Sequence, residues 1–224
     1  MNRRQSQGDV NKVPANANIL FGCSNPQVIA DLAPGETVLD LGSGRGFDCF
    51  LAARTVGDQG FVIGVDMNPE MIVKARQNAH KAGIKNIDFR LGEIESLPVE
   101  DNTIDVIISN CVINLSPDKG RVFQEAFRVL KAGGRLAITD IVATTPLPDN
   151  VREDPTFYVA CVAGAIFIDD VEIMLKEAGF VNLRIHTKDE SKIFINDWLP
   201  GRQIEDYVVS AEIEALKPKR ANYD

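Results

Sequence analysis

The feature that most constrains this fold is the stretch VLDLGSGRGFD, in which three glycines follow an apolar run and precede a helical pattern. Residues 36–42 are predicted to form a buried strand, and residues 46–57 have the apolar spacing of a helix. The glycines of the intervening loop carry no side chain, so its backbone can closely approach a ligand; they are Gly42, Gly44 and Gly46. A strand, a glycine loop and a helix in this order are typical of nucleotide- or nucleoside-binding domains.

Strand-like and helix-like segments alternate along most of the chain, which predicts an α/β fold with a mostly parallel sheet and helices on both faces. Further strands are expected at 61–67, 86–92, 103–110 and 135–142, and helices at 68–83, 116–134 and 169–180. The segments 181–189 and 191–199 flank Glu190 like a terminal β-hairpin, and residues 202–216 are expected to form a last helix.

Two carboxylates accompany the glycine loop and indicate which nucleoside it binds. Asp66 ends the second strand, 20 residues after Gly46, where a carboxylate accepts hydrogen bonds from ribose hydroxyls. The glycines follow the spacing G-x-G-x-G and are preceded by Asp40, whereas dinucleotide-binding loops have G-x-G-x-x-G. The Asp40 carboxylate would repel a pyrophosphate but suits the amino group of a methionine moiety, so a dinucleotide is disfavoured.

This pattern resembles that of the class I S-adenosylmethionine-dependent methyltransferases. GEIESLP (92–98) is similar to the family's third motif, and LPVEDNTIDVIISN and RVLKAGGRLAITD resemble the segments that lead into its fourth and fifth strands. The resemblance implies a Rossmann-like fold with a seven-stranded sheet and S-adenosylmethionine as cofactor. The residues that it assigns to the cofactor are Asp40, Gly42, Ser43, Gly44, Gly46, Asp66, Met67, Glu93, Ile94 and Asn110.

Three longer segments narrow the resemblance to the arsenite methyltransferases. They are FGCSNPQVIADLAPGETVLDLGSGRGFDCFLAAR, RLGEIESLPVEDNTIDVIISNCVINLSPDKGRVFQEAFRVLKAGGRLAITDIV and YVACVAGA. In that family three cysteines bind trivalent arsenic, and their motifs match Cys23 in GCSNP, Cys111 in SNCVINL and Cys161 in YVACVAGA. The resemblance therefore implies that this trio holds arsenite or one of its thiol conjugates as the substrate, with a thiol reductant as partner.

The implied chemistry is consistent with the residue types. Trivalent arsenic is a soft centre, and thiolate is the soft ligand that proteins offer. Three thiolates leave arsenic with one lone pair, which can attack a sulfonium methyl without a general base because no proton leaves arsenic. The protein then contributes positioning, which is worth on the order of 7–11 kcal/mol for a well-oriented pair. Since a free thiol has a pKa of about 8.5, ligation must displace protons.

Two other functions stay open at this point. A small-molecule C- or O-methyltransferase with a quinone-type acceptor would need a general base, and the strand-four motif contains no histidine or tyrosine. A non-catalytic metalloid-binding protein would have no use for a methyl donor. Cys49 falls within the first helix and is expected to be a small buried thiol. Asn110 and Asn114 are candidates for shaping the acceptor pocket.

Composition and organisation add further expectations. The formal net charge of −8 on 224 residues disfavours nucleic acid as the main partner. No apolar run reaches membrane-helix length and no secretion signal follows Arg3 and Arg4, so a cytoplasmic protein without a membrane partner is expected. The expected organisation is a polar arm at 1–18, a methyltransferase domain at 19–200 with 143–168 covering the active site, and a C-terminal helix and tail at 201–224.

Overall fold

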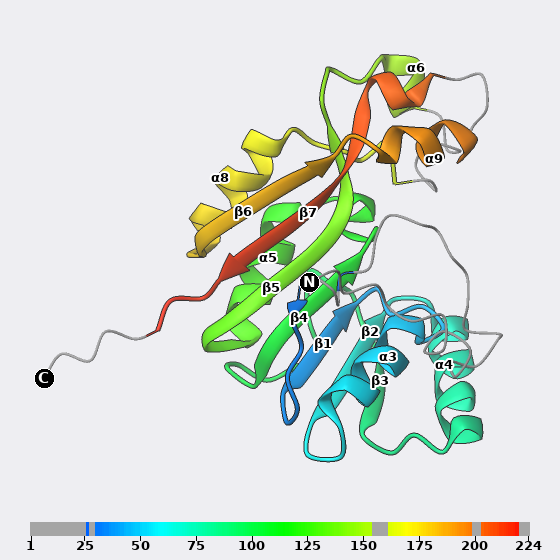
Figure 1. Ribbon diagram of the computed structural model, residues 1–224, viewed down its shortest axis with the longest axis vertical. Coiled ribbons are helices and arrows are strands. Elements are labelled where there is room, and N and C mark those ends of the chain that lie inside the picture. Colours follow the sequence, from blue (N-terminus) through cyan, green and yellow to red (C-terminus); the bar gives the residue numbers. More distant parts are fainter. Residues whose placement is uncertain (1–25, 27–29, 154–160, 199–202, 220–224) are drawn as a thin grey trace, which may run out of the picture.

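The computed structural model describes residues 26, 30–153, 161–198 and 203–219, which are built around a seven-stranded sheet (Figure 1). The spatial order is β3-β2-β1-β4-β5-β7-β6. The strands are β1 (Thr37–Leu41), β2 (Phe61–Asp66), β3 (Ile87–Leu91), β4 (Ile104–Asn110), β5 (Leu130–Ala143), β6 (Val181–Lys188) and β7 (Val208–Leu216). Neighbours from β3 to β5 pair in parallel, and β7 lies antiparallel between β5 and β6. The predicted Rossmann-like sheet is confirmed.

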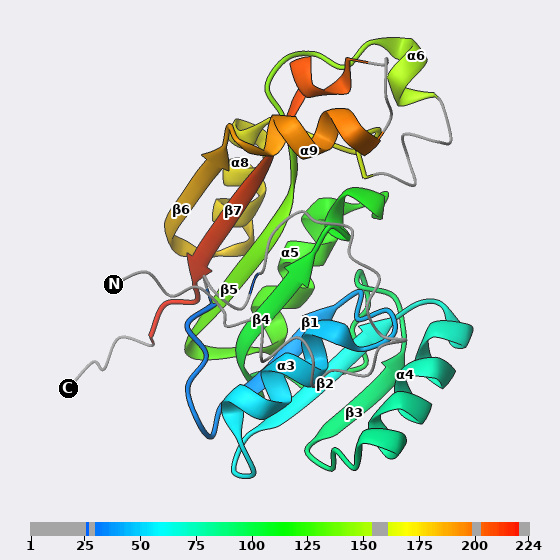
Figure 2. The same cartoon turned by 45° about the vertical axis from the view of Figure 1, so that its right-hand side comes forward.

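Helices cover both faces of this sheet, as predicted (Figure 2). On one face, α3 (Phe47–Val56) and α4 (Pro69–Ala82) pack over β1 to β3 around a core that includes Phe50 and Phe89. On the other face, α5 (Lys119–Val129) and α8 (Ile168–Ala178) pack over the central strands and β7. The carboxyl ends of the parallel strands therefore meet at one edge between two buried cores.

The ends of α4 follow the predicted capping chemistry. The Asn68 side chain accepts a hydrogen bond from the Glu70 main-chain nitrogen at 2.9 Å, and Pro69 is the first helical residue. Gly83 ends the helix in the left-handed region with φ of 67°. These caps fix the start of α4 directly after Asp66, the carboxylate expected to bind ribose.

The expected helix 116–134 is shorter in the structure. Helix α5 ends at Val129, and the chain turns straight into β5 at Leu130, which pairs with Ile104. The Lys217 ammonium donates to the main-chain oxygens of Phe127 and Leu130, both at 2.7 Å, and so satisfies carbonyls at the helix end. The glycines of this segment therefore lie in the strand rather than in a helix cap.

The C-terminal prediction was wrong in two elements. Residues 191–198 form helix α9 (Ser191–Trp198) instead of a strand, and residues 208–216 form β7 instead of a helix. The hairpin therefore pairs β6 with β7 across α9. Strand β7 buries Ala211, Ile213 and Ala215, while its glutamates form cross-strand ion pairs with β6: Glu212 with Lys188 and Glu214 with Arg184.

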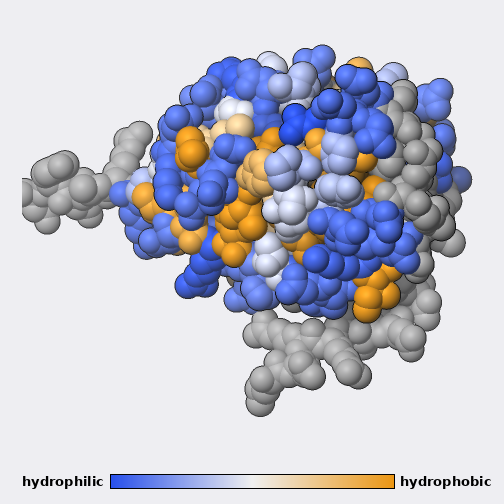
Figure 3. All heavy atoms as spheres, turned by 90° about the horizontal axis from the view of Figure 1, so that it is seen from above, coloured by the Kyte–Doolittle hydropathy of each residue, from blue (hydrophilic) through white to orange (hydrophobic). Residues whose placement is uncertain are grey.

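A small third core lies beyond the carboxyl ends of the strands. It joins α6 (Asp149–Arg152), α9 and the 3-10 turn η3 (Ile204–Asp206) to the ends of β5 and β7 and to residues 161–165. We call this unit the cap. The described parts of the predicted cover, 143–153 and 161–168, contribute to it together with the C-terminal elements. Seen from the end that carries α6 and α9, hydrophilic side chains dominate the surface, with smaller apolar patches between them (Figure 3).

The expected N-terminal arm, 1–18, lies outside the described residues. Within the residues that the structure does describe, none of the helices combines the length and apolar character needed to cross a bilayer.

Candidate active site

The glycine loop follows β1 at the carboxyl edge of the sheet, and its glycines have different surroundings. A Cβ on Gly42 would lie 2.5 Å from Val112 Cγ2, and one on Gly46 would lie 2.6 Å from Phe89 Cζ. These two glycines are therefore required for packing within the protein. A Cβ on Gly44 would meet no atom within 4 Å. Gly44 is thus the position where the loop leaves space for a ligand.

Asp66 is tied to this loop at the end of β2. Its two carboxylate oxygens accept hydrogen bonds from the main-chain nitrogens of Gly44 and Asn68, each at 2.8 Å. A carboxylate offers about four acceptor sites, so Asp66 keeps capacity for ribose hydroxyls. This contact joins the glycine loop to the end of β2, so the two predicted cofactor-binding segments lie side by side.

Asp40, the acid that precedes the glycines, is buried and has an unexpected partner. The thiol of Cys49 donates a hydrogen bond to Asp40 Oδ2 at 3.1 Å. Burial raises the pKa of Asp40 well above its ordinary value, the nearby charges of Asp48 and Asp66 raise it further, and the Cys49 hydrogen bond lowers it. Cys49 is buried, as predicted, but it also holds the carboxylate, which sequence reasoning missed.

Three further predicted cofactor residues surround the loop. The hydroxyl of Ser43 is buried without a hydrogen-bond partner among the described residues. Met67, directly after Asp66, is 75% exposed, which is unusual for a large apolar side chain. Asn110, at the end of β4, accepts a hydrogen bond from the Thr139 hydroxyl at 3.2 Å. A buried polar atom and an exposed apolar side chain beside one loop are both consistent with a bound nucleoside.

The segment 92–98, which contains the predicted cofactor residues Glu93 and Ile94, follows β3 and is anchored from α5. Glu93 is exposed, whereas Ile94 is buried in the core beside α5. The Glu125 carboxylate accepts from the Leu97 main-chain nitrogen at 2.9 Å and pairs with Arg128 at 2.7 Å. The Arg128 hydrogen bond holds the pKa of Glu125 below its ordinary range, against the opposing effect of burial. A charged anchor therefore fixes the shape of this segment.

Two of the three predicted arsenic ligands meet just past β4. The Cys161 thiol donates to the Cys111 main-chain oxygen at 2.7 Å, although the two residues are 50 positions apart in the sequence. Both residues are in the left-handed region, with φ of 52° at Cys111 and 61° at Cys161. Such conformations are costly for residues with a Cβ, so the surrounding structure must hold them.

The state of the thiols differs within the predicted trio. Cys111 is disulfide-bonded in the structure, whereas Cys161 is free. Burial, and secondarily the charge of Asp140, raises the pKa of Cys161 to about 12. Cys23 lies outside the described residues, and no cluster of three or more metal-ligating side chains is found among those described. The three-cysteine site therefore stays a prediction.

A buried polar network underlies the two cysteines. The Asp140 carboxylate, near the end of β5, accepts from the main-chain nitrogens of Ile113 and Ile141 at 3.1 and 2.8 Å and from the Asn114 amide at 3.0 Å. Its burial raises its pKa to about 7, despite these main-chain hydrogen bonds. Sequence reasoning missed Asp140, although an acid within the apolar run RLAITDIV was a signal of a buried polar role.

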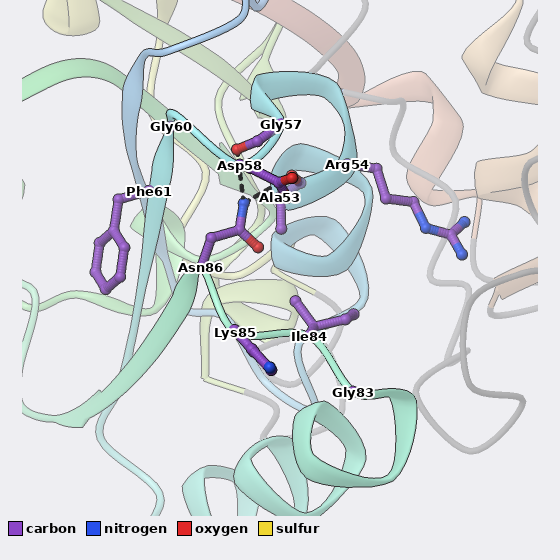
Figure 4. A pocket seen from close by; sticks show the side chains of 10 residues that line it. All are labelled: Ala53, Arg54, Gly57, Asp58, Gly60, Phe61, Gly83, Ile84, Lys85 and Asn86. Carbon is purple, nitrogen blue, oxygen red and sulfur yellow. Dashed lines mark hydrogen bonds between the residues drawn. The ribbon is translucent and has the colours of Figure 1, made fainter.

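A surface hollow elsewhere is remote from this chemistry. It lies beside Phe61, the first residue of β2, and Asn86, which precedes β3, so it is at the opposite end of these strands from Asp66 (Figure 4). The Asn86 amide there donates to the main-chain oxygens of Ala53 and Gly57 at 2.9 and 3.0 Å. The carboxyl edge is therefore the better candidate for the active site.

Several known proteins are similar to this chain over most of its length. A family model described as "Methyltransferase domain" matches residues 32–179. An arsenite methyltransferase of Halobacterium salinarum is 57% identical over 95% of this chain and 54% of its own length. The crystal structure of an arsenic (III) S-adenosylmethionine methyltransferase from Chlamydomonas reinhardtii superposes with a TM-score of 0.75 at 33% identity, over 96% of this chain and 73% of that chain.

A different activity is represented among more distant relatives. A ubiquinone/menaquinone biosynthesis C-methyltransferase of Vibrio campbellii is 34% identical over 68% of this chain and 67% of its own length. The chain spans about half the length of the curated arsenite methyltransferases that it matches.

Proposed function

Because this chain belongs to the S-adenosylmethionine-dependent methyltransferase family that includes the arsenite methyltransferases, we propose that it methylates trivalent arsenic held by cysteine thiolates. The observation that carries the proposal is the position of the Cys111–Cys161 contact. Val112, the next residue, packs against Gly42 of the glycine loop. This packing supports the proposal that the thiols and the loop belong to one site, as methyl transfer between their ligands requires.

The described residues fit S-adenosylmethionine. Asp40 is proposed to bind the amino group, Asp66 the ribose hydroxyls, and Ile94 and Glu93 the adenine edge. The buried Ser43 hydroxyl and the open space above Gly44 fit a ligand laid across the loop. When bound, the cofactor supplies an electrophilic methyl group on a sulfonium. A cationic group beside Asp40 would favour the ionised carboxylate, against the effect of burial.

The cysteines are proposed to act as arsenic ligands rather than as nucleophiles. Cys23, Cys111 and Cys161 would bind arsenic as thiolates, the soft ligands that it prefers. Because the pKa of the Cys161 thiol is about 12, arsenic must displace its proton on binding. Because Cys111 is disulfide-bonded, a thiol reductant would be needed to free it. A general base is unnecessary, since arsenic loses no proton during methylation.

The biological setting is proposed on the same basis. Methylation of arsenite would serve arsenic detoxification in the cytoplasm, where a thiol reductant keeps cysteines available. The formal charge of −8 supports small-molecule substrates over nucleic acid.

One incubation tests the function. The reduced protein is mixed with arsenite, excess thiol and methyl-labelled S-adenosylmethionine, and methylated arsenic is measured. We expect product from the wild type and none from Cys111→Ser, which should retain donor affinity. Methylation of a quinone-type acceptor but not of arsenite would refute the proposal, and so would tight arsenite binding without turnover.

A further inference from the structure

The Asn114 side chain links three segments at the proposed arsenic site. Its amide nitrogen lies 3.0 Å from Asp140 Oδ1, 2.6 Å from the Ile141 main-chain oxygen and 3.1 Å from the Cys161 main-chain oxygen. The amide has two protons for these three acceptors, so one proton is shared. All these groups are buried, where an unmade hydrogen bond is costly. The Asn114 amide, in the loop after β4, therefore donates both to the end of β5 and to the turn at Cys161, which we call the Cys161 turn.

The Cys161 turn also packs directly on the Asn114 backbone. A Cβ on Gly164 would lie 1.9 Å from the Asn114 main-chain oxygen, so only glycine allows this approach. On the other side, the Asp140 carboxylate accepts from the Ile113 main-chain nitrogen at 3.1 Å and fixes the start of the 3-10 turn η2 (Ile113–Leu115). Asn114 thus sets the position of Cys161 in two ways, through its side-chain amide and through its main-chain oxygen.

We infer that Asn114 is a positioning residue that sets the separation between the Cys111 and Cys161 sulfurs, with Asp140 as its anchor. The inference rests on the proposed function for its purpose, because a soft ion is chelated well only when its ligands are correctly spaced. Asn114 donates a hydrogen bond to the Cys161 carbonyl and acts on the Cys161 sulfur through it. It follows Cys111 by three residues, so one short turn carries both a ligand and the group that orients the second ligand.

The test uses phenylarsine oxide, which binds tightly only where two thiols are close together. A reduced Cys23→Ser protein leaves Cys111 and Cys161 as the paired thiols of the site. In that background Asn114→Ala should raise the Kd of phenylarsine oxide by about tenfold, as expected for about 1.4 kcal/mol of lost binding. The Kd of S-adenosylmethionine should stay within about twofold, a change of under 0.5 kcal/mol.

A second variant keeps the inference testable if Asn114→Ala folds poorly. Gly164→Ala removes no hydrogen-bonding group and no thiol, but displaces the Cys161 turn from Asn114. It should weaken phenylarsine oxide binding by a similar factor.

Asn86 supplies a matched control. Its amide also donates to two main-chain oxygens, at 2.9 and 3.0 Å, but lies beside the remote hollow. Asn86→Ala should lower the free energy of unfolding and leave the Kd of phenylarsine oxide unchanged. The inference is overturned if Asn114→Ala and Gly164→Ala bind the probe like their parent, or if Asn86→Ala weakens it as much. Failure of the proposed function is seen separately, as a wild type that binds the probe but does not methylate arsenite.

Discussion

At the scale of single residues, buried polar groups decide how the site behaves. Asp40 and Asp140 are both carboxylates at the carboxyl edge, and burial raises the pKa of each. Asp40 is held by the Cys49 thiol, and Asp140 by main-chain nitrogens and Asn114. The two acids therefore face opposite halves of the site, the proposed donor and the proposed acceptor.

The raised pKa of Asp140 predicts a specific pH dependence of stability. Its ordinary pKa is 3.8 and its folded value is about 7. Between these values the folded protein keeps a proton that the unfolded chain releases, so the free energy of unfolding falls as pH rises from about 4 to about 7. The contribution is on the order of 4 kcal/mol, fully present at low pH and lost above about pH 7.

Asp140→Asn isolates this contribution. The variant should be less stable at all pH values, because an amide nitrogen then faces main-chain donors. Urea denaturation from pH 4 to pH 8 should show the difference between wild type and variant shrinking as pH rises. A constant difference would contradict the assignment.

Some of these residue roles could be predicted from the sequence and others could not. The glycine loop and Asp66 stand out because their spacing is local and their chemistry is shared by many nucleoside-binding proteins. The Cys49–Asp40 contact depends on the first turn of α3 folding back over β1. Asn114 and Asp140 are 26 positions apart in the sequence, and no local spacing encodes their contact.

At the scale of elements, different glycines of the glycine loop serve packing and the proposed ligand binding. Gly42→Ala should be strongly destabilising, because its Cβ would overlap Val112 and its φ is 71°. Gly44→Ala has open space around the new Cβ, so it should cost only the left-handed conformation, about 1–2 kcal/mol. Its methyl group would instead occupy the space proposed for S-adenosylmethionine.

Two measurements distinguish these effects. Gly44→Ala should raise the Kd of S-adenosylmethionine by more than about tenfold, a loss above about 1.4 kcal/mol. Val112→Ala should recover part of the stability of Gly42→Ala, since it removes both overlapping γ-methyl groups. Normal donor affinity in Gly44→Ala would show that the ligand does not cross the loop there.

The elements also show where sequence patterns mislead. Residues 191–199 are predicted to form a strand, yet residues 191–198 form α9, which leaves Ile193 exposed and Ile195 buried in the cap. Residues 204–216 contain helix-forming Glu, Ala and Leu, yet the alternation at Ala211, Ile213 and Ala215 was the better guide to β7. Tertiary pairing with β5 and β6 outweighs local propensity here.

At the scale of the whole molecule, the sheet edge carries the proposed donor site and the cap carries part of the proposed arsenic site. The glycine loop belongs to the sheet edge, whereas Cys161 belongs to the cap and Cys111 packs against the cap's core. Donor and acceptor ligands should therefore stabilise the fold independently.

Thermal unfolding tests this separation together with the redox state. A ligand at 100 times its Kd stabilises the native state by about 2.7 kcal/mol. S-adenosylmethionine should raise the Tm with or without reductant. Arsenite should raise it only after the Cys111 disulfide is reduced, and not in Cys111→Ser. An equal arsenite shift in unreduced wild type would argue against Cys111 as a ligand.

The left-handed backbone at Cys111 and Cys161 has a consequence for how this protein tolerates change. A glycine at either position would relieve about 1–2 kcal/mol of conformational cost. It would also delete a thiol and the contact that this thiol makes, which is the disulfide of Cys111 or the hydrogen bond from Cys161 to the Cys111 main-chain oxygen. In a library screened for thermal robustness, glycine should therefore replace Cys161 before Cys111, because a hydrogen bond contributes less to stability than a disulfide.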